Sequence, residues 1–181
     1  TKLEFAQAAL DELKNLQSKF GTYFIVGNHE YIHGVQPIID YVNSLGIKTL
    51  ENENVYVGPK DEGFYLCGVY DRFGNRYGSY KPDITKALEN TTNHPTVLLA
   101  HQPKFVDEIE NTEGIDLILC GHTHGGQIFP FNFLVKLQQP YVKGLNIHND
   151  FTQVYVNKGT GFWGPPMRLG ASSEISILKL S

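Results

Sequence analysis

The chain has 181 residues, of which 41% are hydrophobic and 12% aromatic, so it can build the core of one folded domain over residues 1–181. Its formal charge of -4 argues against a broad basic face, and nucleic acid is therefore not an expected partner. No apolar run approaches the roughly 20 residues that cross a bilayer, so we expect residues 1–181 to be soluble.

The amino-terminal part of the chain predicts helix, strand and helix in turn. Apolar residues recur every three or four positions from Leu3 to Phe20, which indicates an amphipathic helix that ends at Gly21. The run from Thr22 to Val26 is rich in β-branched and aromatic residues and predicts a buried strand, so residues 28–30 are expected on the loop that follows. Residues 37–45 begin with proline and predict a second helix.

The rest of the chain alternates short apolar runs with helical patterns. Strands are predicted over residues 47–50, 55–57, 64–69, 96–100, 115–120, 153–157 and 174–180, and helices over residues 82–90 and 105–109. This alternation indicates an α/β or layered α+β fold whose strands end on polar residues, at the edge where open α/β sheets bind ligands. Cys67 and Cys120 lie within two of the strands, and we expect both to be reduced and buried.

Histidines follow three of the predicted strands. His29, His101 and the pair His122 and His124 each come directly or soon after an apolar run, mostly beside glycine. Burying a histidine costs desolvation, so this repeated placement predicts a shared polar site. His122 and His124 are separated by one residue in a glycine-flanked loop, which lets both rings face one cavity. The other histidines are expected to face solvent: His33, His94 and His148.

A metal site is the chemistry that these side chains favour. Imidazole binds zinc, iron and manganese, and the side chain of Asn28 can add an amide oxygen, so the candidate ligands are Asn28, His101, His122 and His124. All four are neutral, whereas two adjacent divalent cations need carboxylates to offset their repulsion. Glu30 is expected to support a ligand, and Asp71 lies in a loop. The pattern therefore predicts that acidic ligands are missing from this sequence.

Three motifs occur in order, each after a predicted strand: Gly27-Asn28-His29-Glu30, Ala100-His101-Gln102-Pro103 and Gly121-His122-Thr123-His124. They resemble the later motifs of the calcineurin-like metallophosphoesterase superfamily. The resemblance implies a four-layer αββα sandwich, two divalent metal ions (Mn, Fe or Zn) with a bridging hydroxide, and a phosphoester substrate that is hydrolysed by a phosphatase or phosphodiesterase. Two earlier family motifs, Asp-x-His and Gly-Asp-x-x-Asp, do not occur, and the sequence begins with Thr1. We therefore expect a domain that lacks its amino-terminal part, including the first two strands.

The resemblance also assigns roles to individual residues. Asn28, His101 and His122 would bind one metal ion, and His124 would help to bind the other. His29 would act as a general acid on the leaving oxygen, with Asn28 also touching the phosphate. Candidate substrate contacts are Asp71, Arg72 and Arg168.

Two longer runs, residues 121–127 and 159–170, look like a bacterial branch of the superfamily. Members of that branch often carry amino-terminal membrane helices, and some act on lipid-linked phosphodiester or pyrophosphate substrates. The resemblance thus implies a membrane-associated parent protein, anchored through segments upstream of this sequence. Phe162 and Trp163 are expected to pack in the core rather than to face an acyl chain. The alternative is a non-catalytic metal-binding or interaction module, and the isolated 181 residues are expected to show little activity.

Overall fold

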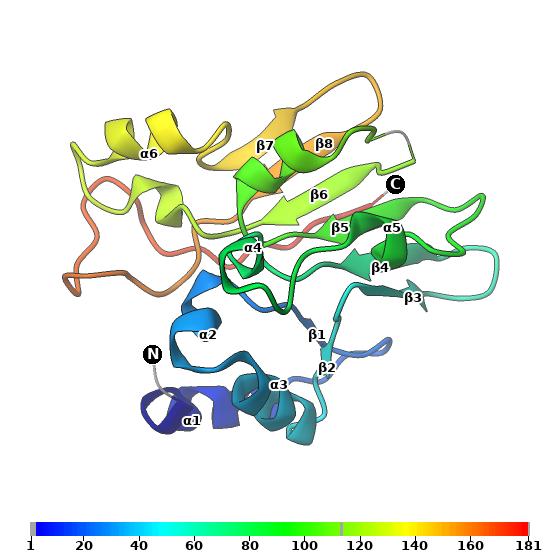
Figure 1. Ribbon diagram of the computed structural model, residues 1–181, viewed down its shortest axis with the longest axis horizontal. Helices are drawn as coiled ribbons and strands as arrows, with labels where there is room; N and C mark the ends of the chain where they lie inside the picture. Colours follow the sequence, from blue (N-terminus) through cyan, green and yellow to red (C-terminus); the bar gives the residue numbers. More distant parts are fainter. Residues whose placement is uncertain (1–2, 113, 181) are drawn as a thin grey trace. The chain divides into compact units, whose positions relative to one another are not determined.

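The computed structural model describes residues 3–112 and 114–180. The chain forms two compact units, Thr1–His101 and Gln102–Ser181, which run from blue to green and from green to red in Figure 1. Each unit combines helices with strands, so the predicted mixed α/β class is confirmed. None of the helices within the described ranges has the length and apolar character that crossing a bilayer requires.

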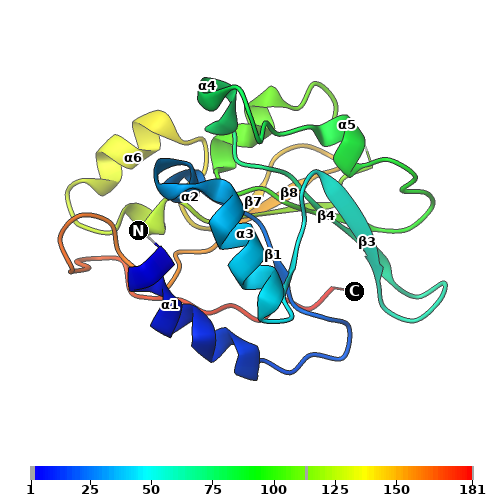
Figure 2. The same cartoon turned by 60° about the horizontal axis from the view of Figure 1, so that its bottom comes forward.

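The first helix is shorter than the sequence pattern predicts. Helix α1 covers Leu3–Asp11 and continues as a 3-10 turn, η1 (Glu12–Asn15), after which Leu16 is extended, with ψ of 127°. Leu16 and Phe20 are exposed, so no apolar surface holds a longer helix in place. Helix α1 lies beside α3 (Val35–Ser44), as Figure 2 shows, and the Tyr41 hydroxyl donates to Asp11 Oδ1 at 2.7 Å.

Helix α2 (Asn28–His33) forms where a loop was predicted. Its first turn is stabilised by Glu30, whose Oε2 accepts a hydrogen bond from the Gly27 N–H at 2.6 Å. Gly34, with φ of 103°, separates α2 from α3. The loop prediction is therefore wrong, and Asn28 and His29 occupy the first turn of a short helix.

The strands of the first unit form two groups. Strand β1 (Tyr23–Phe24) pairs in parallel with β2 (Lys48–Thr49). Strand β4 (Phe64–Gly68) lies between β3 (Glu53–Val57), which is antiparallel to it, and β5 (Thr96–Leu99), which is parallel. The predicted strands are confirmed, with boundaries that differ by about one to three residues. Two short helices complete this unit: α4 (Gly74–Tyr77) and α5 (Ile84–Ala87).

In the second unit, β8 (Gln153–Val156) lies between β6 (Leu117–Cys120), which is parallel to it, and β7 (Gly144–Ile147), which is antiparallel. The other elements are η2 (Pro103–Glu108), η3 (His124–Gly126) and α6 (Asn132–Gln138). The strand predicted over residues 174–180 is wrong, because residues 171–180 contain no strand. The alternation there does not bury its apolar positions: Ile175 and Ile177 are 87% and 97% exposed.

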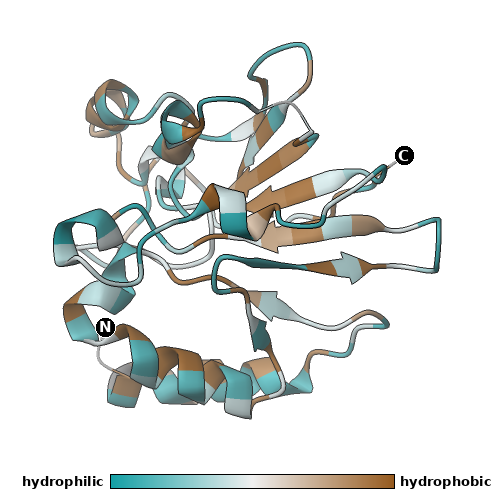
Figure 3. Cartoon of the chain, turned by 45° about the vertical axis from the view of Figure 1, so that its right-hand side comes forward, coloured by the Kyte–Doolittle hydropathy of each residue, from teal (hydrophilic) through white to brown (hydrophobic). Residues whose placement is uncertain are grey.

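Each unit has its own buried residues, and Figure 3 shows that several strands are mainly apolar, drawn in brown, whereas others also carry hydrophilic residues. In the first unit, Val26, Tyr31, Val35 and Ile39 form one cluster, and Ile38, Val42 and Ile47 form another. In the second unit, the apolar side chains of β6 and β8 include Ile118, Val154 and Val156, all almost fully buried. Val26 directly precedes Gly27 and Asn28, and Ile118 lies in β6, which precedes His122. Buried residues therefore lie close in sequence to candidate ligands in each unit.

The cysteine prediction is confirmed. Cys67 and Cys120 are both free and buried. Burial raises the pKa of the Cys67 thiol to about 12 and raises that of Cys120 as well, so neither thiol ionises near neutral pH. The prediction for Phe162 and Trp163 is wrong, because both side chains are exposed rather than packed in a core.

Candidate functional site

Asn28 and His101 meet within the first unit, although they are far apart in sequence. The chain leaves β1 and delivers Asn28 at the start of α2, and it leaves β5 and delivers His101. His101 Nε2 lies 3.0 Å from Asn28 Oδ1, and both residues are half-buried. An amide oxygen can only accept a hydrogen bond, so Nε2 is the donor in this pair. Two of the predicted ligands therefore face each other.

Gly27 makes this approach possible. A Cβ at this position would lie 2.8 Å from Cε1 and Nε2 of His101, well inside the closest contact that real Cβ atoms make. The φ of Gly27 is -106°, which any residue can adopt. Glycine is therefore needed here because it has no side chain, and not because of an unusual backbone conformation. Any larger residue at position 27 would push the imidazole away from Asn28.

The separation of the two ligand atoms fits the metal ion that the resemblance implies. Two ligands that bind one cation at about 2.1 Å, at about a right angle, lie about 3.0 Å apart. The observed 3.0 Å between Nε2 and Oδ1 suits that arrangement once Nε2 has lost its proton. Residues 3–112 and 114–180 contain no group of three or more His, Cys, Asp or Glu side chains placed to bind a metal. Asn28 and His101 would contribute two neutral donor atoms to such a site, and their role as ligands stays a prediction.

His29 is the next residue along α2 after Asn28. Its side chain is exposed, in the first turn of the helix, whereas Asn28 is half-buried. The resemblance implies a general acid at this position beside Asn28. The geometry is compatible with a general acid at this position, and the role of His29 stays a prediction.

The loop that carries His122 and His124 is strained. His122, His124 and Gln127 have φ of 65°, 51° and 46°, a left-handed conformation that costs free energy in residues other than glycine. Gly125 and Gly126, with φ of 66° and 85°, occupy the same region without that cost. Strained backbone of this kind persists only where surrounding contacts enforce it, and it gathers at functional sites.

Buried polar side chains enforce the conformation of this loop. The Thr123 hydroxyl donates to the Val142 carbonyl at 2.7 Å. Gln127 is fully buried, and its side-chain amide donates to the Trp163 carbonyl at 2.8 Å and accepts from the Trp163 N–H at 2.7 Å. These hydrogen bonds join the runs over residues 121–127 and 159–170. Sequence analysis missed this role of Gln127.

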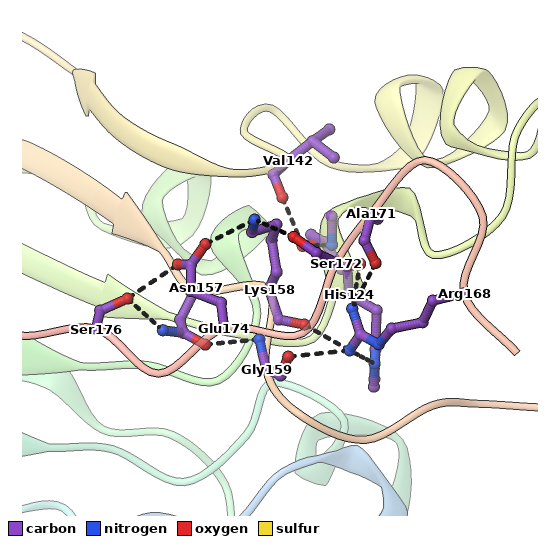
Figure 4. A network of polar contacts seen from close by, with 12 residues as sticks. His124, Val142, Asn157, Lys158, Gly159, Arg168, Ala171, Ser172, Glu174 and Ser176 are labelled. Atoms are coloured by element: carbon purple, nitrogen blue, oxygen red, sulfur yellow. Dashed lines mark hydrogen bonds and ion pairs between the residues drawn. The ribbon is translucent and has the colours of Figure 1, made fainter. Parts of the chain in front are cut away.

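Arg168 binds the same loop from the other side, as Figure 4 shows. Its guanidinium donates to the carbonyl and to Nδ1 of His124, both at 3.2 Å. Because a guanidinium can only donate, Nδ1 accepts, and the neutral ring carries its proton on Nε2. The remaining hydrogen bonds from Arg168 reach the carbonyls of Lys158 at 2.8 Å, Gly159 at 3.1 Å, Gly161 at 2.8 Å and Ala171 at 3.3 Å. The predicted substrate contact of Arg168 stays a prediction.

A second polar cluster, also drawn in Figure 4, holds the segment that receives Arg168. Lys158 Nζ lies 2.9 Å from Glu174 Oε2, and the Tyr155 hydroxyl donates to Glu174 Oε1 at 2.7 Å. The Tyr155 hydrogen bond, followed by that of Lys158, lowers the pKa of Glu174 to about 2. Asn157 Oδ1 accepts from the Gly159 N–H at 2.6 Å. The carbonyls of Lys158 and Gly159 are thereby held toward the guanidinium.

Asp71 and Arg72, the other predicted substrate contacts, lie after β4. Asp71 is only 2% exposed, and its Oδ1 accepts from the Phe73 N–H at 2.7 Å, an arrangement that caps a tight turn. Arg72 is half-buried in that turn. A role for either residue in substrate binding stays a prediction.

The three histidines that were expected to face solvent differ among themselves. His33 is exposed, as predicted. His94 is half-buried and packs edge-on against Tyr56, with ring centroids 5.1 Å apart. His148 is half-buried as well, and its Nδ1 lies 3.0 Å from the Tyr141 hydroxyl. The prediction is therefore wrong for His94 and His148, because aromatic neighbours cover them.

Comparison with known proteins places these motifs in a family. The family model of the calcineurin-like phosphoesterases matches residues 3–126. An uncharacterized metallophosphoesterase of Helicobacter pylori strain J99 is 48% identical over 179 residues, which are 98% of this chain and 47% of that protein. A Campylobacter jejuni metallophosphoesterase is 42% identical over 94% of this chain and 45% of its own length. A Bos taurus transmembrane protein with a metallophosphoesterase domain is 41% identical over 96% of this chain and 42% of its own length.

The present chain thus spans just under half the length of these curated relatives. Its match to the family model extends from α1 to the end of η3, and it includes all three motifs that carry the candidate ligands. The chain belongs to the calcineurin-like phosphoesterase family.

Proposed function

We propose that the whole protein that contains this chain is a metal-dependent phosphoester hydrolase. The observation that carries the proposal is the approach of His101 Nε2 to Asn28 Oδ1, 3.0 Å apart, in the space that Gly27 leaves open. Family membership supports the same reaction class. Because the chain spans just under half the length of its relatives, the activity is proposed for the whole protein.

The proposed ligands are Asn28, His101, His122 and His124, which would contribute to a centre with two divalent ions, either manganese, iron or zinc. Divalent ions supply Lewis acidity at the phosphoryl group and lower the pKa of a bound water. For His124, ligation through Nε2 would require the neutral ring to carry its proton on Nδ1 instead, so the hydrogen bond from Arg168 to Nδ1 would be lost.

The remaining steps belong to side chains of this chain. Asn28 orients the phosphoryl group, because its amide N–H groups can donate to a non-bridging oxygen while its Oδ1 faces His101. As the oxygen of water forms its bond to phosphorus, the bond to the leaving oxygen breaks, and a ring N–H of His29 passes its proton to that leaving oxygen. The proton lost by the attacking water goes to solvent, and His29 regains a proton from solvent afterwards.

The proposal extends to phosphodiester or pyrophosphate substrates that are attached to a lipid, and to a membrane-associated protein. The runs over residues 121–127 and 159–170 support it through their similarity to the bacterial branch, and the bovine relative is named a transmembrane protein. The alternative is a non-catalytic module that binds metal without turnover. In either function the four candidate ligands of this chain are neutral, so acidic ligands that compensate the charge of two divalent ions would come from the rest of the whole protein.

Hydrolysis of bis(4-nitrophenyl) phosphate by the whole protein separates the two functions. We expect release of nitrophenol that stops when EDTA removes the divalent ions and returns when manganese is added, because no side chain in the site replaces a Lewis acid. A release rate that EDTA leaves unchanged would contradict the metal-dependent reaction. Manganese binding with no hydrolysis of any phosphomonoester or phosphodiester would identify the non-catalytic module.

A further inference from the structure

The second unit contains a cavity of about 560 Å³ beside the loop that carries His122 and His124. This volume lies within the range of about 300–1,000 Å³ that small-molecule sites occupy. Its lining includes Gly125 and Gly126, which directly follow His124, and residues 169–171. Asn132 and Lys136 of helix α6 and residues 139–143 also line it. We call this space the α6 cavity.

Two parts of this lining, residues 125–126 and residues 169–171, are held by hydrogen bonds that also hold His124. Arg168 binds the carbonyl and ring of His124 and the carbonyl of Ala171. The Leu169 N–H donates to the Gln127 carbonyl at 2.8 Å, and the Phe129 N–H donates to the Leu169 carbonyl at 2.9 Å. The lining is therefore held by the same hydrogen bonds as His124, a proposed metal ligand that Gly125 directly follows in the sequence.

The lining of the α6 cavity favours an anion that has an apolar body. Lys136 and Lys143 line it, both exposed, and no Asp or Glu is among its lining residues. Within residues 3–112 and 114–180 neither ammonium has a hydrogen-bond or ion-pair partner. Apolar surface comes from Phe129, Val142 and Leu169. Two uncompensated positive charges above an apolar wall attract an anionic group and accommodate its hydrocarbon part.

One carboxylate lies close to this lining. The pKa of Tyr141 is raised by burial and, to a lesser degree, by the charge of Asp107. Asp107 does not line the cavity, whereas the two lysines do, so the positive charge faces a ligand more directly. The cavity therefore keeps its preference for anions.

We propose that the α6 cavity binds a part of the substrate that is ester-linked to the scissile phosphate, and that this part carries a second negative charge on an apolar group. The inference rests on the proposed function, because it assigns the cavity to the same phosphoester substrate. It predicts discrimination between substrates that differ only in the charge of the group that occupies the cavity. Lys136 and Lys143 then determine substrate specificity.

A matched pair of substrates tests this specificity in the whole protein. In 4-nitrophenyl 4-carboxyphenyl phosphate the second ester group is anionic, and in the 4-carbamoylphenyl analogue it is a neutral isostere. The double variant Lys136→Gln/Lys143→Gln is expected to raise KM for the carboxylate about fivefold, with kcat and the KM for the carbamoyl analogue unchanged, because exposed ion pairs contribute modestly. Equal KM values for both substrates in the unmodified protein would overturn the proposal.

A charge-matched control distinguishes the effect of the two cavity lysines on KM from the effect of the net charge of the protein. Lys60→Gln/Lys86→Gln removes the same charge from two exposed lysines of the first unit, and it is expected to leave both KM values unchanged. The same fivefold rise in this control would show that net charge, and not the α6 cavity, attracts the substrate. That result would also overturn the proposal.

A binding measurement keeps this test independent of turnover. The metal-free protein is titrated with 1-anilinonaphthalene-8-sulfonate, an anion with an aromatic body, and its fluorescence is followed. We expect the Kd to rise about fivefold in Lys136→Gln/Lys143→Gln and to stay constant in the control variant. If the protein shows this shift in Kd but hydrolyses no phosphoester, the proposed function is rejected and the α6 cavity is still an anion-binding site. An unchanged Kd in both variants would reject the cavity while leaving hydrolysis intact.

Discussion

Replacing Gly126 with alanine is expected to lower the free energy of unfolding of the second unit by about 2–4 kcal/mol. Two effects add at this position. The φ of 85° is unfavourable for any residue with a Cβ, and the new Cβ would lie 2.4 Å from Cβ and 2.7 Å from Cα of Asn132. The Cα atom of Asn132 cannot move without shifting the start of α6. The loop that carries His122 and His124 must therefore change its conformation. Urea unfolding, followed by the fluorescence of Trp163, measures the loss.

Gly144→Ala is the matched control for this substitution. Gly144 also has a positive φ, 70°, but a Cβ there would have no atom within 4 Å. It therefore incurs only the conformational penalty, about 1 kcal/mol, and the difference between the two variants isolates the contact with Asn132. Trp163 is the only tryptophan of the 181 residues, and its backbone binds Gln127, so its signal reports the loop itself. Equal destabilisation by both substitutions would contradict the contact.

His29→Gln is expected to slow hydrolysis about 100-fold when the leaving group is phenol, and to slow it little when the leaving group is 4-nitrophenol. A phenolate, whose conjugate acid has a pKa of about 10, needs a proton as the bond to phosphorus breaks. The more stable nitrophenolate leaves without one, and the exposed ring of His29 is the proposed donor. The measurement is kcat/KM for the two diesters, phenyl and 4-nitrophenyl, with metal in excess.

His33→Gln is the control for the His29 substitution, because His33 is exposed on the same helix one turn later. It is expected to leave both rates unchanged. If His29→Gln instead slowed both leaving groups equally, the residue would position substrate or metal and would not transfer a proton. A rate unaffected by His29→Gln for either diester would exclude a catalytic role.

Patterns along the sequence predicted strands better than helix ends. Strands β4 and β5 are short, largely buried runs, and a continuous run of apolar residues in the sequence predicts such a strand. Helix α1 was predicted too long because the apolar spacing continues to Phe20, although no surface covers Leu16. Helix α2 was missed because residues 28–30 were predicted to form a loop after the strand, although Glu30 at the third helical position is a capping signal in the sequence.

The candidate site also has features that the sequence predicts and features that it does not. The residue types of Asn28, His101, His122 and His124 and their position after strands could be predicted, because each motif is local. The contact between Asn28 and His101 joins residues 73 apart, and Gln127 reaches Trp163 across 36 residues, so no local pattern contains either. Helix α6 was also missed, since it is only seven residues long and its large apolar residues, Phe133, Leu134 and Leu137, are exposed. These pairings depend on how each unit folds.

Manganese content tests the proposed metal ligands most directly. The whole protein and its single variants are dialysed against manganese, and the bound metal per chain is measured by mass spectrometry. We expect less bound metal in Asn28→Ala, His101→Ala, His122→Ala and His124→Ala, and unchanged content in His33→Ala, His94→Ala and His148→Ala, because only the first group supplies donor atoms to the proposed centre. Equal manganese content in all seven variants would contradict the assignment of these four residues as ligands.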